Sequence, residues 1–234
     1  MREQLGADIC IVNGENVADG AGITPKLADR LLRAGADVLT LGNHTYRRDG
    51  IGDYLAKSDR VIRPANAGAL TQGRGLAVVE AANGVKVAVL NVLGALFLDT
   101  PVSPWEVIDE LVDDARSQAP VVVLDFHAEA TSEKVAMARW LDGRVTAVIG
   151  THTHVQTNDA RVLPGGTAAI TDAGMTGPHD SVIGVKAELA IRRMRTRLPV
   201  RFEPAEGGVR IEGVVVDCSD DGRARGIELL RVDV

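Results

Sequence analysis

Two histidines, His152 and His154, are separated by one residue and directly follow an apolar run from Val145 to Ile149. Such a run is typical of a buried β-strand, and on an extended chain two side chains at this spacing point the same way. Their imidazoles could bind one metal ion or reach two adjacent ions. A polar turn that happens to hold two histidines is the alternative. Because four of the five histidines follow strand-like runs, the pattern favours a metal site.

Side chains that can bind a metal follow an apolar run at four places along the chain. They are Glu15 and Asn16, Asn43 and His44, His127, and His152 and His154. Ligands of open α/β sheets collect at the carboxyl ends of strands, so neighbouring strands would bring these groups to one crevice. Histidines, a carboxylate and amide oxygens favour Fe, Mn or Zn and disfavour a thiolate-type structural zinc. The set fits two divalent ions that share a carboxylate better than one ion, and pairs about 3.5–4 Å apart are typical of phosphoryl chemistry.

Each member of this set also has an interpretation without a metal. Glu15, Asn16 and Asn43 could simply be turn residues. His127 could be a hydrogen-bonded histidine of the core, and His44 could lie in an exposed loop. Asp125, inside an apolar strand, either orients a ligand histidine or is a hydrogen-bonded buried acid. We expect Glu129 and Glu133 to serve the N-terminus of the next helix. The joint pattern, rather than any one residue, indicates the metal site.

Strands and helices that could position these residues alternate in the first half of the chain. The pattern predicts strands at 7–12 and 37–41, a short extended piece at 61–64, a helix that begins at Thr24-Pro25 and ends near Gly35, and a polar helix over about 49–57. Thr24 is expected at the N-cap and Pro25 at the first helical position.

The second half mixes hairpins with further strand and helix pairs. We expect strands at 76–80, 85–92, 121–126, 145–149, 167–171, 209–217 and 224–232, and helices at about 104–117, 131–141 and 186–197. Asn83-Gly84 is a hairpin signal, Ser103-Pro104 a helix start, and Thr131 the expected cap of the following helix. This mixture predicts a mostly β sandwich with outer helices, rather than a doubly wound parallel sheet, as one domain over residues 1–234.

Composition excludes several classes of protein. The net charge of −6 argues against a broad nucleic-acid or anionic-membrane surface, and the aromatic content of 3% against a platform for stacking single-stranded nucleic acid. The two cysteines, Cys10 and Cys218, form no CxxC motif. No apolar run reaches the roughly 20 residues of a membrane span, and no secretory signal is apparent. We expect a cytoplasmic protein with reduced thiols.

The order of these motifs resembles that of the calcineurin-like metallophosphoesterases, which place Asn-His and then Gly-His-x-His on successive strand ends. Here the matching stretches are Gly42-Asn43-His44 and Gly150-Thr151-His152-Thr153-His154. The finer match is to the bacterial YmdB family, and it covers nearly the whole chain. The blocks that carry it are Asn13-Gly14-Glu15-Asn16, Leu41-Gly42-Asn43-His44, Arg63-Pro64-Ala65-Asn66, the run from Asp125 to Lys134, and Gly174-Met175-Thr176-Gly177-Pro178.

The resemblance implies a four-layer αββα sandwich around two metal ions. Glu15 would be the bridging carboxylate, His44 the general acid, and the other ligands would divide between the ions. Asn16 and His154 would belong to the first metal, and Asn43, His127 and His152 to the second. The family is associated with phosphodiesterase activity, including on 2′,3′-cyclic nucleotides, with a link to RNA turnover, and its members form dimers or tetramers. The predicted reaction is attack by a metal-bridging hydroxide, with His44 protonating the leaving ribose oxygen.

The sequence departs from the family in one respect. Family members begin with an extra strand that ends in a Gly-Asp turn, and no residue here matches that aspartate, which binds the first metal. We therefore expect the first strand and helix to be missing from this chain. Either the start was placed too late or the protein lacks this piece, and the intact remaining motifs favour a start placed too late. Two alternatives remain open. One is a degenerate member that binds metal or nucleotide and acts as a regulatory protein; the other is a metal-dependent amidohydrolase, although that βα-barrel class carries His-x-His early in the chain.

Overall fold

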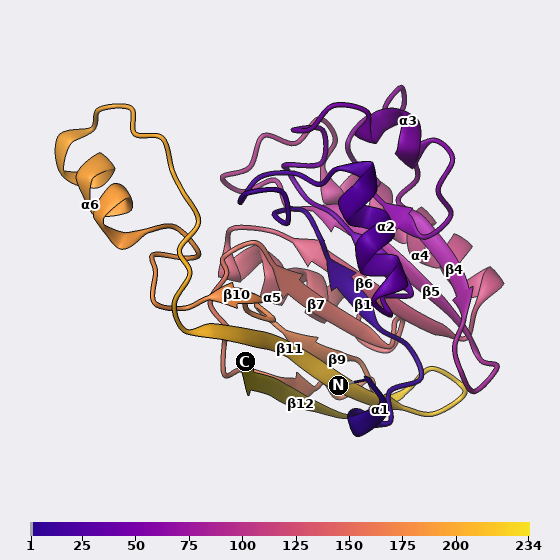
Figure 1. Cartoon of the computed structure of the whole chain (residues 1–234). Helices are drawn as coiled ribbons and strands as arrows, with labels where there is room; N and C mark the ends of the chain where they lie inside the picture. Colours follow the sequence, from indigo (N-terminus) through magenta and orange to yellow (C-terminus); the bar gives the residue numbers. More distant parts are fainter. Residues whose placement is uncertain (1) are drawn as a thin grey trace.

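The computed structural model describes residues 2–234, and its strands form three sheets (Figure 1). The largest has the strand order β4-β5-β6-β7-β9-β8. Its strands are β4 (Leu76–Glu80), β5 (Lys86–Leu93), β6 (Val121–His127), β7 (Ala147–Thr151), β8 (Arg161–Val162) and β9 (Ala168–Ile170). Strands β5, β6, β7 and β9 run parallel, whereas β4 and β8 are antiparallel to their neighbours. The carboxyl ends of the four parallel strands therefore lie at one edge.

Two three-stranded sheets lie against one face of the large sheet. One is the parallel set β1 (Ile11–Asn13), β2 (Val38–Thr40) and β3 (Val61–Ile62), and the other is the antiparallel set β10 (Gly177–Pro178), β11 (Val209–Cys218) and β12 (Ala224–Asp233). Val38 of β2 packs with Val89 of β5 in the interior, and Val216 of β11 packs with Ala147 of β7. These contacts form the middle of a sandwich.

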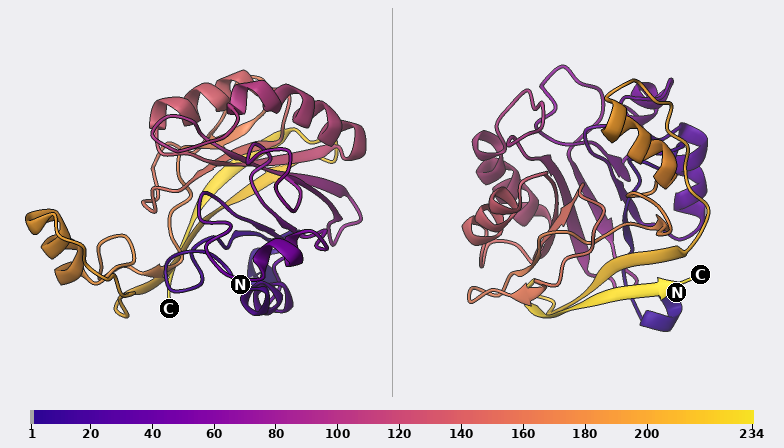
Figure 2. Two further views of the ribbon diagram at one scale, coloured as in Figure 1. Left: turned by 90° about the horizontal axis from the view of Figure 1, so that it is seen from above. Right: turned by 90° about the vertical axis from the view of Figure 1, so that its left-hand side faces the viewer.

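Helices cover the two outer faces of this sandwich (Figure 2). The helices are α1 (Arg2–Leu5), α2 (Pro25–Arg33), α3 (Ile51–Leu55), α4 (Pro104–Gln118), α5 (Thr131–Trp140) and α6 (Ala187–Thr196). Apolar side chains of α4 and α5, such as Val112 and Met137, pack on the large sheet. Ala28 of α2 and Leu55 of α3 pack on the β1-β2-β3 sheet. The expected four-layer mixed α/β sandwich is confirmed.

Strand β6 shows how the sequence divides its side chains between two layers. Successive residues of a strand point to opposite faces. Val122, Leu124 and Phe126 face the helical layer, which leaves Asp125 and His127 on the inner face, toward the smaller sheets. Both are buried although they are polar. Buried polar groups must find hydrogen-bond partners, so the end of β6 delivers chemical groups into the interior of the sandwich.

Most predicted elements are present, and several differences have local causes. Thr24 caps α2 as expected, because its Oγ1 accepts from the Leu27 amide at 3.3 Å. The first strand is shorter than predicted and begins at Ile11, because the Cys10 amide donates to the Asp37 carboxylate at 2.8 Å instead of to a strand. The helix predicted at 49–57 is shorter in the structure, where it is α3. Its N-cap, Gly50, has a left-handed backbone with φ 75°.

The expected cap at Thr131 is wrong. Thr131 is the first helical residue of α5, and Ala130 occupies the N-cap without a side-chain hydrogen bond. Strands β8 and β10 were not predicted, because two residues are too few to show periodicity. Among residues 2–234, no helix is long and apolar enough to cross a membrane.

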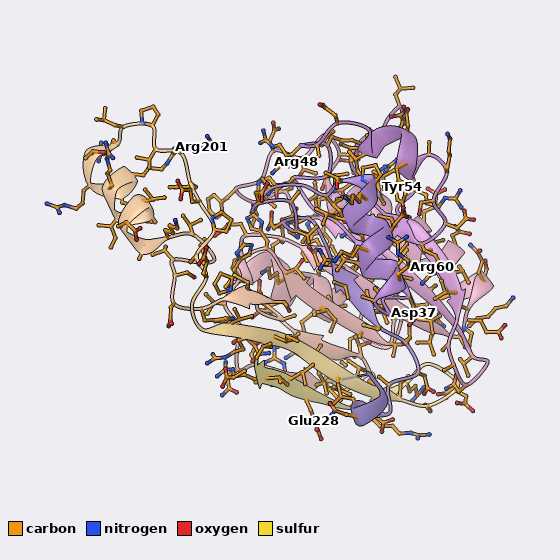
Figure 3. The ribbon with its side chains drawn as sticks, viewed as in Figure 1. Asp37, Arg48, Tyr54, Arg60, Arg201 and Glu228 are labelled. Atoms are coloured by element: carbon orange, nitrogen blue, oxygen red, sulfur yellow. The ribbon has the colours of Figure 1, made fainter. Side chains whose placement is uncertain are left out.

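Helix α6 lies apart from the layers (Figures 1 and 2). It projects sideways from the body, and the chain returns through Arg201 to β11 (Figure 3). Residues 191–199 are all exposed, so this segment contributes little to the core.

Candidate metal centre

The four places at which the sequence puts metal-competent residues meet at one edge of the sandwich. Strands β1 and β2 run parallel in one sheet, and β6 and β7 run parallel in the facing sheet. The residues beyond their carboxyl ends converge there. Asn43 Oδ1 lies 3.0 Å from His127 Nε2 across 84 positions of sequence. The expected convergence is therefore present.

His127 Nε2 lies at the centre of the cluster. It is 3.1 Å from Glu15 Oε1, 3.0 Å from Asn43 Oδ1 and 3.0 Å from His152 Nδ1. Glu15, His127 and His152 offer ligand atoms that all lie within 4.8 Å of one another. Together with Asn43, these residues are four of the six predicted ligands, and they surround one point.

A buried hydrogen-bond chain sets the proton position on His127. The Thr151 hydroxyl donates its only proton to Asp125 Oδ1 at 2.6 Å, so it must accept from His127 Nδ1, which is 2.9 Å away. Nδ1 therefore carries the ring proton and Nε2 presents a lone pair. This is the orienting role expected for Asp125.

Asp125 is itself held by both sheets. Asn13 Nδ2 and Thr40 Oγ1 donate to its Oδ2 at 3.0 and 2.5 Å. Burial raises the pKa of Asp125, against the opposing effects of His127 and of these hydrogen bonds. The carboxylate thus joins β1 and β2 to the end of β7.

The second imidazole is oriented in the same sense. His152 Nε2 lies 3.0 Å from Glu129 Oε2, so the proton belongs on Nε2 and the Nδ1 lone pair faces His127. Glu129 was expected to serve a helix terminus, and that expectation is wrong. Burial lowers the pKa of His152, which favours the neutral ring. Glu133 lies in the first turn of α5, as expected, and accepts from the Ala95 amide at 2.8 Å.

Four electron-pair donors therefore point at one small volume without protons between them. Such an arrangement is repulsive unless a cation occupies it. Two ligands bound at right angles, each about 2.1 Å from an ion, lie about 3.0 Å apart. The distances from His127 Nε2 to its three neighbours have this value. The donor set and its spacing fit a divalent metal ion.

Glu15 is prepared as an anion. It is 1% exposed, and burial alone would raise the pKa of its carboxyl. With a proton on its Nε2, His127 outweighs that effect through a hydrogen bond and its charge, together with the backbone amide of His44, and the pKa falls to about 2. A metal ion in the place of that proton acts in the same direction. The His44 amide donates to Oε2 at 3.1 Å, which leaves Oε1 directed toward His127.

Asn16, His44 and His154 lie beside this cluster and outside its closest group. Asn16 Nδ2 is 3.1 Å from His154 Nε2 and donates to Glu15 Oε1 at 3.3 Å. Its Oδ1 accepts from His44 Nδ1 at 2.8 Å. Burial lowers the pKa of His44, and the charge of Glu15 opposes that effect. The structure thus brings together every residue that the sequence placed at the site, in two adjacent groups.

The His-x-His turn differs from the extended geometry expected. Strand β7 ends at Thr151, and both histidines have left-handed backbones, with φ 98° for His152 and 67° for His154. Their side chains therefore reach different partners, namely His127 and Asn16. Left-handed backbone is costly for residues other than glycine and gathers at functional sites.

Asp172 holds the strained turn, and the sequence did not single it out. Its Oδ2 accepts from the amide and the hydroxyl of Thr153, at 3.0 and 2.7 Å. Lys134 Nζ donates to the same oxygen at 3.0 Å, and both members of this ion pair are buried. Asp172 directly follows a predicted strand, and that position was the available signal.

Gly42 explains why the cluster lies so close to the backbone. A Cβ at this position would lie 2.2 Å from Glu15 Oε2 and 2.4 Å from His127 Nε2. The backbone of Gly42 does not need glycine for its φ angle, so the requirement is for space alone.

Comparison with known proteins identifies the family of the chain. A protein-family profile described as YmdB-like protein matches residues 1–230. A 2′,3′-cyclic-nucleotide 2′-phosphodiesterase of Bacillus subtilis (strain 168) is 47% identical over 222 residues, which are 95% of this chain and 83% of that protein.

Two crystal structures have the same fold. One, a hypothetical protein from Thermus thermophilus, has a TM-score of 0.90 at 38% identity and covers 97% of this chain and 88% of its own. The other, described as a novel phosphatase from Mycoplasma pneumoniae, has a TM-score of 0.88 at 34% identity, and the match covers 99% of this chain and 84% of that protein. The predicted calcineurin-like fold is confirmed.

The variant Gly42→Ala tests whether metal binding requires the space that a side chain at position 42 would fill. The added methyl group is expected to displace Glu15 and His127, so equilibrium dialysis against Zn²⁺ should show loss of bound metal while circular dichroism keeps the wild-type spectrum. Gly226→Ala is the control, because a Cβ there meets nothing within 4 Å. Equal metal content in both variants would contradict the assignment.

Asp172→Asn tests the support of the His-x-His turn. Loss of the anion leaves the Lys134 ammonium buried without its counter-ion, which typically destabilises a folded protein by about 3–5 kcal/mol. It also weakens the hydrogen bonds that hold the turn at Thr153, which should weaken metal binding by about 10- to 100-fold. Urea unfolding and Zn²⁺ titration measure the two effects. Asp59→Asn, which breaks an exposed pair with Arg74, should cost about 1 kcal/mol or less. Asp172→Asn with unchanged Zn²⁺ affinity would show that the turn does not depend on this residue.

Proposed function

The chain belongs to the family of YmdB-like proteins, and from this premise we propose that it is a metal-dependent phosphodiesterase acting on 2′,3′-cyclic nucleotides or related RNA-derived phosphodiesters. The observation that supports the proposal is the convergence of Glu15, Asn43 and His152 on the unprotonated nitrogen of His127. The activity for which the Bacillus subtilis relative is named supports the substrate class.

Two divalent ions, of Fe, Mn or Zn, would be held by this chain's own residues. Glu15, with Asn43, His127 and His152, would bind one ion. Asn16 and His154 would bind the other and share Glu15 with the first. Ions held there would neutralise the phosphate oxygens and make water a stronger nucleophile near neutral pH.

His44 is the proposed general acid. Its Nδ1 donates to Asn16 Oδ1 at 2.8 Å, so Nε2 is the nitrogen left to exchange a proton with substrate. The His44 side chain is 29% exposed, which allows contact with a ligand. A cyclic phosphodiester that opens at its 2′ bond leaves a ribose oxygen, and a proton from Nε2 would neutralise that oxygen as it departs.

Hydrolysis of bis-p-nitrophenyl phosphate and of 2′,3′-cAMP with Mn²⁺ tests the proposal. Loss of outer partners of a metal ligand already costs about 10- to 100-fold, so His152→Ala, which removes a ligand itself, is expected to lower kcat/KM by about 100-fold or more. His179→Ala is the matched control, because His179 Nε2 lies 3.2 Å from the Met175 carbonyl and outside the cluster. It should retain wild-type rates.

Equal rates for the wild type and His152→Ala would overturn the assignment of the site. A wild-type protein that binds metal but hydrolyses neither compound would instead support the regulatory alternative.

A further inference from the structure

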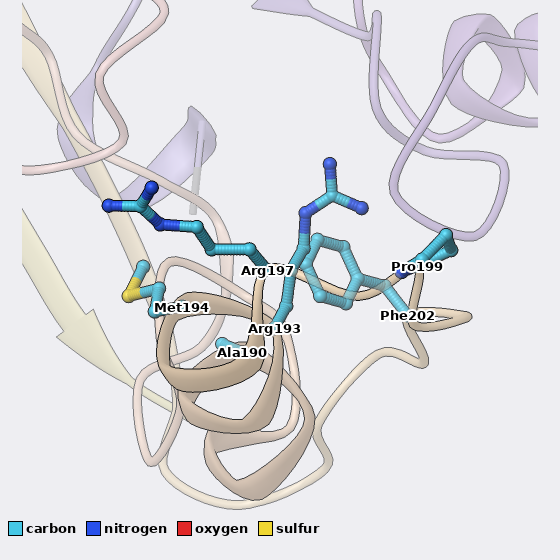
Figure 4. A pocket seen from close by; sticks show the side chains of 6 residues that line it. All are labelled: Ala190, Arg193, Met194, Arg197, Pro199 and Phe202. Atoms are coloured by element: carbon cyan, nitrogen blue, oxygen red, sulfur yellow. The ribbon is translucent and has the colours of Figure 1, made fainter.

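Phe97 is exposed to an extent that is unusual for an aromatic side chain. The chain has three phenylalanines. Phe126 is fully buried in the core, and the Phe202 ring lies 5.5 Å from the Arg193 guanidinium beside α6 (Figure 4). Phe97 is 86% exposed, which leaves its ring largely uncovered. An exposed ring forgoes the stabilisation that burial of its apolar surface would give, so packing does not account for this residue.

The backbone of Phe97 is unfavourable as well. Its φ angle is 69°, in the left-handed region that favours glycine. Residues other than glycine that are held in this region gather at binding and catalytic sites, as His152 and His154 do in this chain. Folding therefore favours neither the exposure of Phe97 nor its conformation, and both point to a role in binding.

The ends of the loop that carries Phe97 are joined by a buried side chain. The loop connects β5 to α4 over residues 94–103. Asn66, which is 1% exposed, donates from Nδ2 to the carbonyls of Leu93 at 2.9 Å and Val102 at 3.0 Å. A loop closed in this way has little conformational freedom left to lose when a ligand binds.

A second buried side chain holds the residues directly before Phe97. The Glu133 carboxylate of α5 accepts from the Ala95 amide at 2.8 Å and from the Leu96 amide at 3.2 Å. Glu133 is 4% exposed, so these bonds are shielded from water. The strained residue thus stands on a fixed base, and its ring is presented in a set position.

The loop begins beside the candidate metal centre. Strand β5 pairs in parallel with β6, and the Gly94 amide donates to the His127 carbonyl at 3.0 Å. A Cβ at Gly94 would lie 2.5 Å from the Cβ of Ala128, so the loop packs on the segment that carries His127 and Glu129. Phe97 follows Gly94 by three residues, which span at most about 10–11 Å of extended chain. Phe97 therefore belongs to the rim of the metal centre.

We propose that Phe97 stacks against the base of the cyclic nucleotide and is a specificity-determining residue of the site. This inference rests on the proposed function and names the part of the substrate that is recognised besides the phosphate. The base of a nucleoside 2′,3′-cyclic phosphate is attached to the ribose that carries the reacting group, so a surface for the base belongs on the rim of the metal centre. Every base has a π face, so Phe97 selects nucleotides over other cyclic phosphodiesters without choosing among bases. A single ring suits one nucleotide rather than a strand.

A second copy of the chain is the other candidate partner for this ring. Exposed apolar side chains also mark protein interfaces, and Leu96, beside Phe97, is 49% exposed. A contact between copies would not require a loop fixed to the segment of His127, whereas recognition of the base does. The position of the loop therefore favours the base, and the experiment separates the two.

The variant Phe97→Gly removes the ring without straining the loop, because glycine adopts a positive φ freely. Hydrolysis with Mn²⁺ is compared for 2′,3′-cAMP and for methyl riboside 2′,3′-cyclic phosphate, which has the same reacting group and no base. The kcat/KM of the variant for 2′,3′-cAMP is expected to fall about 5- to 150-fold, the range of one base–aromatic stack, mainly through a higher KM. Its kcat/KM for the riboside should not change. Phe97→Trp should keep the wild-type preference.

Trp140→Ala is the matched control. Trp140 is an aromatic residue that is 53% exposed, and it ends α5, whose first turn lies nearest His127. This variant should hydrolyse both compounds at wild-type rates. Equal kcat/KM of the wild type and Phe97→Gly for 2′,3′-cAMP would overturn the proposal, and so would an equal loss on both compounds. A changed molar mass of Phe97→Gly in light scattering, with the wild-type preference intact, would assign the ring to a contact between copies instead.

Binding of 3′-AMP, the product of opening the 2′ bond, separates this inference from the proposed function. Equilibrium dialysis with Mn²⁺ is expected to show at least about fivefold weaker binding of 3′-AMP to Phe97→Gly than to the wild type, and equal binding of ribose 3-phosphate to both. That result without hydrolysis of either cyclic compound would support stacking on Phe97 while contradicting the proposed function. Equal affinity of the two proteins for 3′-AMP would overturn the stacking role.

Discussion

The buried carboxylate of Asp125 is the contact on which the site depends. It accepts hydrogen bonds from Asn13 and Thr40 of one sheet and from Thr151 of the facing sheet. Because Thr151 has a single proton to give, its bond to Asp125 forces His127 to donate from Nδ1 and frees Nε2. One interaction thus joins the two layers and fixes the proton position on the central imidazole.

The residues of this centre contribute unfavourably to the free energy of folding. Burial raises the pKa of Asp125, both histidines of the His-x-His turn have left-handed backbones, and an ion pair between Lys134 and Asp172 is buried to hold that turn. Each of these features costs folding free energy or contributes little to it. Their concentration at one edge of the sandwich is typical of a site kept for chemistry, where local rules are broken and the rest of the fold compensates.

The sequence predicts the strands and their polar ends because both signals are local. Apolar runs identified β6 and β7, and the polar residues directly after them do converge in space. The orientation of the His-x-His turn could not be predicted, because it depends on Asp172, which lies 19 positions from Thr153. Gly42 was visible only as part of a motif, since its need for space arises from Glu15 and His127, which follow or end other strands.

Helix α6 shows the same limit in another form. The sequence predicted this helix at about 186–197, but a helical pattern does not reveal whether a helix packs on the body or leaves it. The arginines of this helix could be assigned to a solvated face from the sequence, and the structure places the helix on a projection that stands apart from the layered body.

The most direct test of the central claim is anomalous diffraction from crystals equilibrated with Zn²⁺. The arrangement of lone pairs predicts an anomalous peak about 2.0–2.2 Å from Glu15 Oε1, Asn43 Oδ1, His127 Nε2 and His152 Nδ1, with the His127 Nδ1 to Thr151 hydrogen bond intact. No peak at this point, or a peak bound to other residues, would contradict the account.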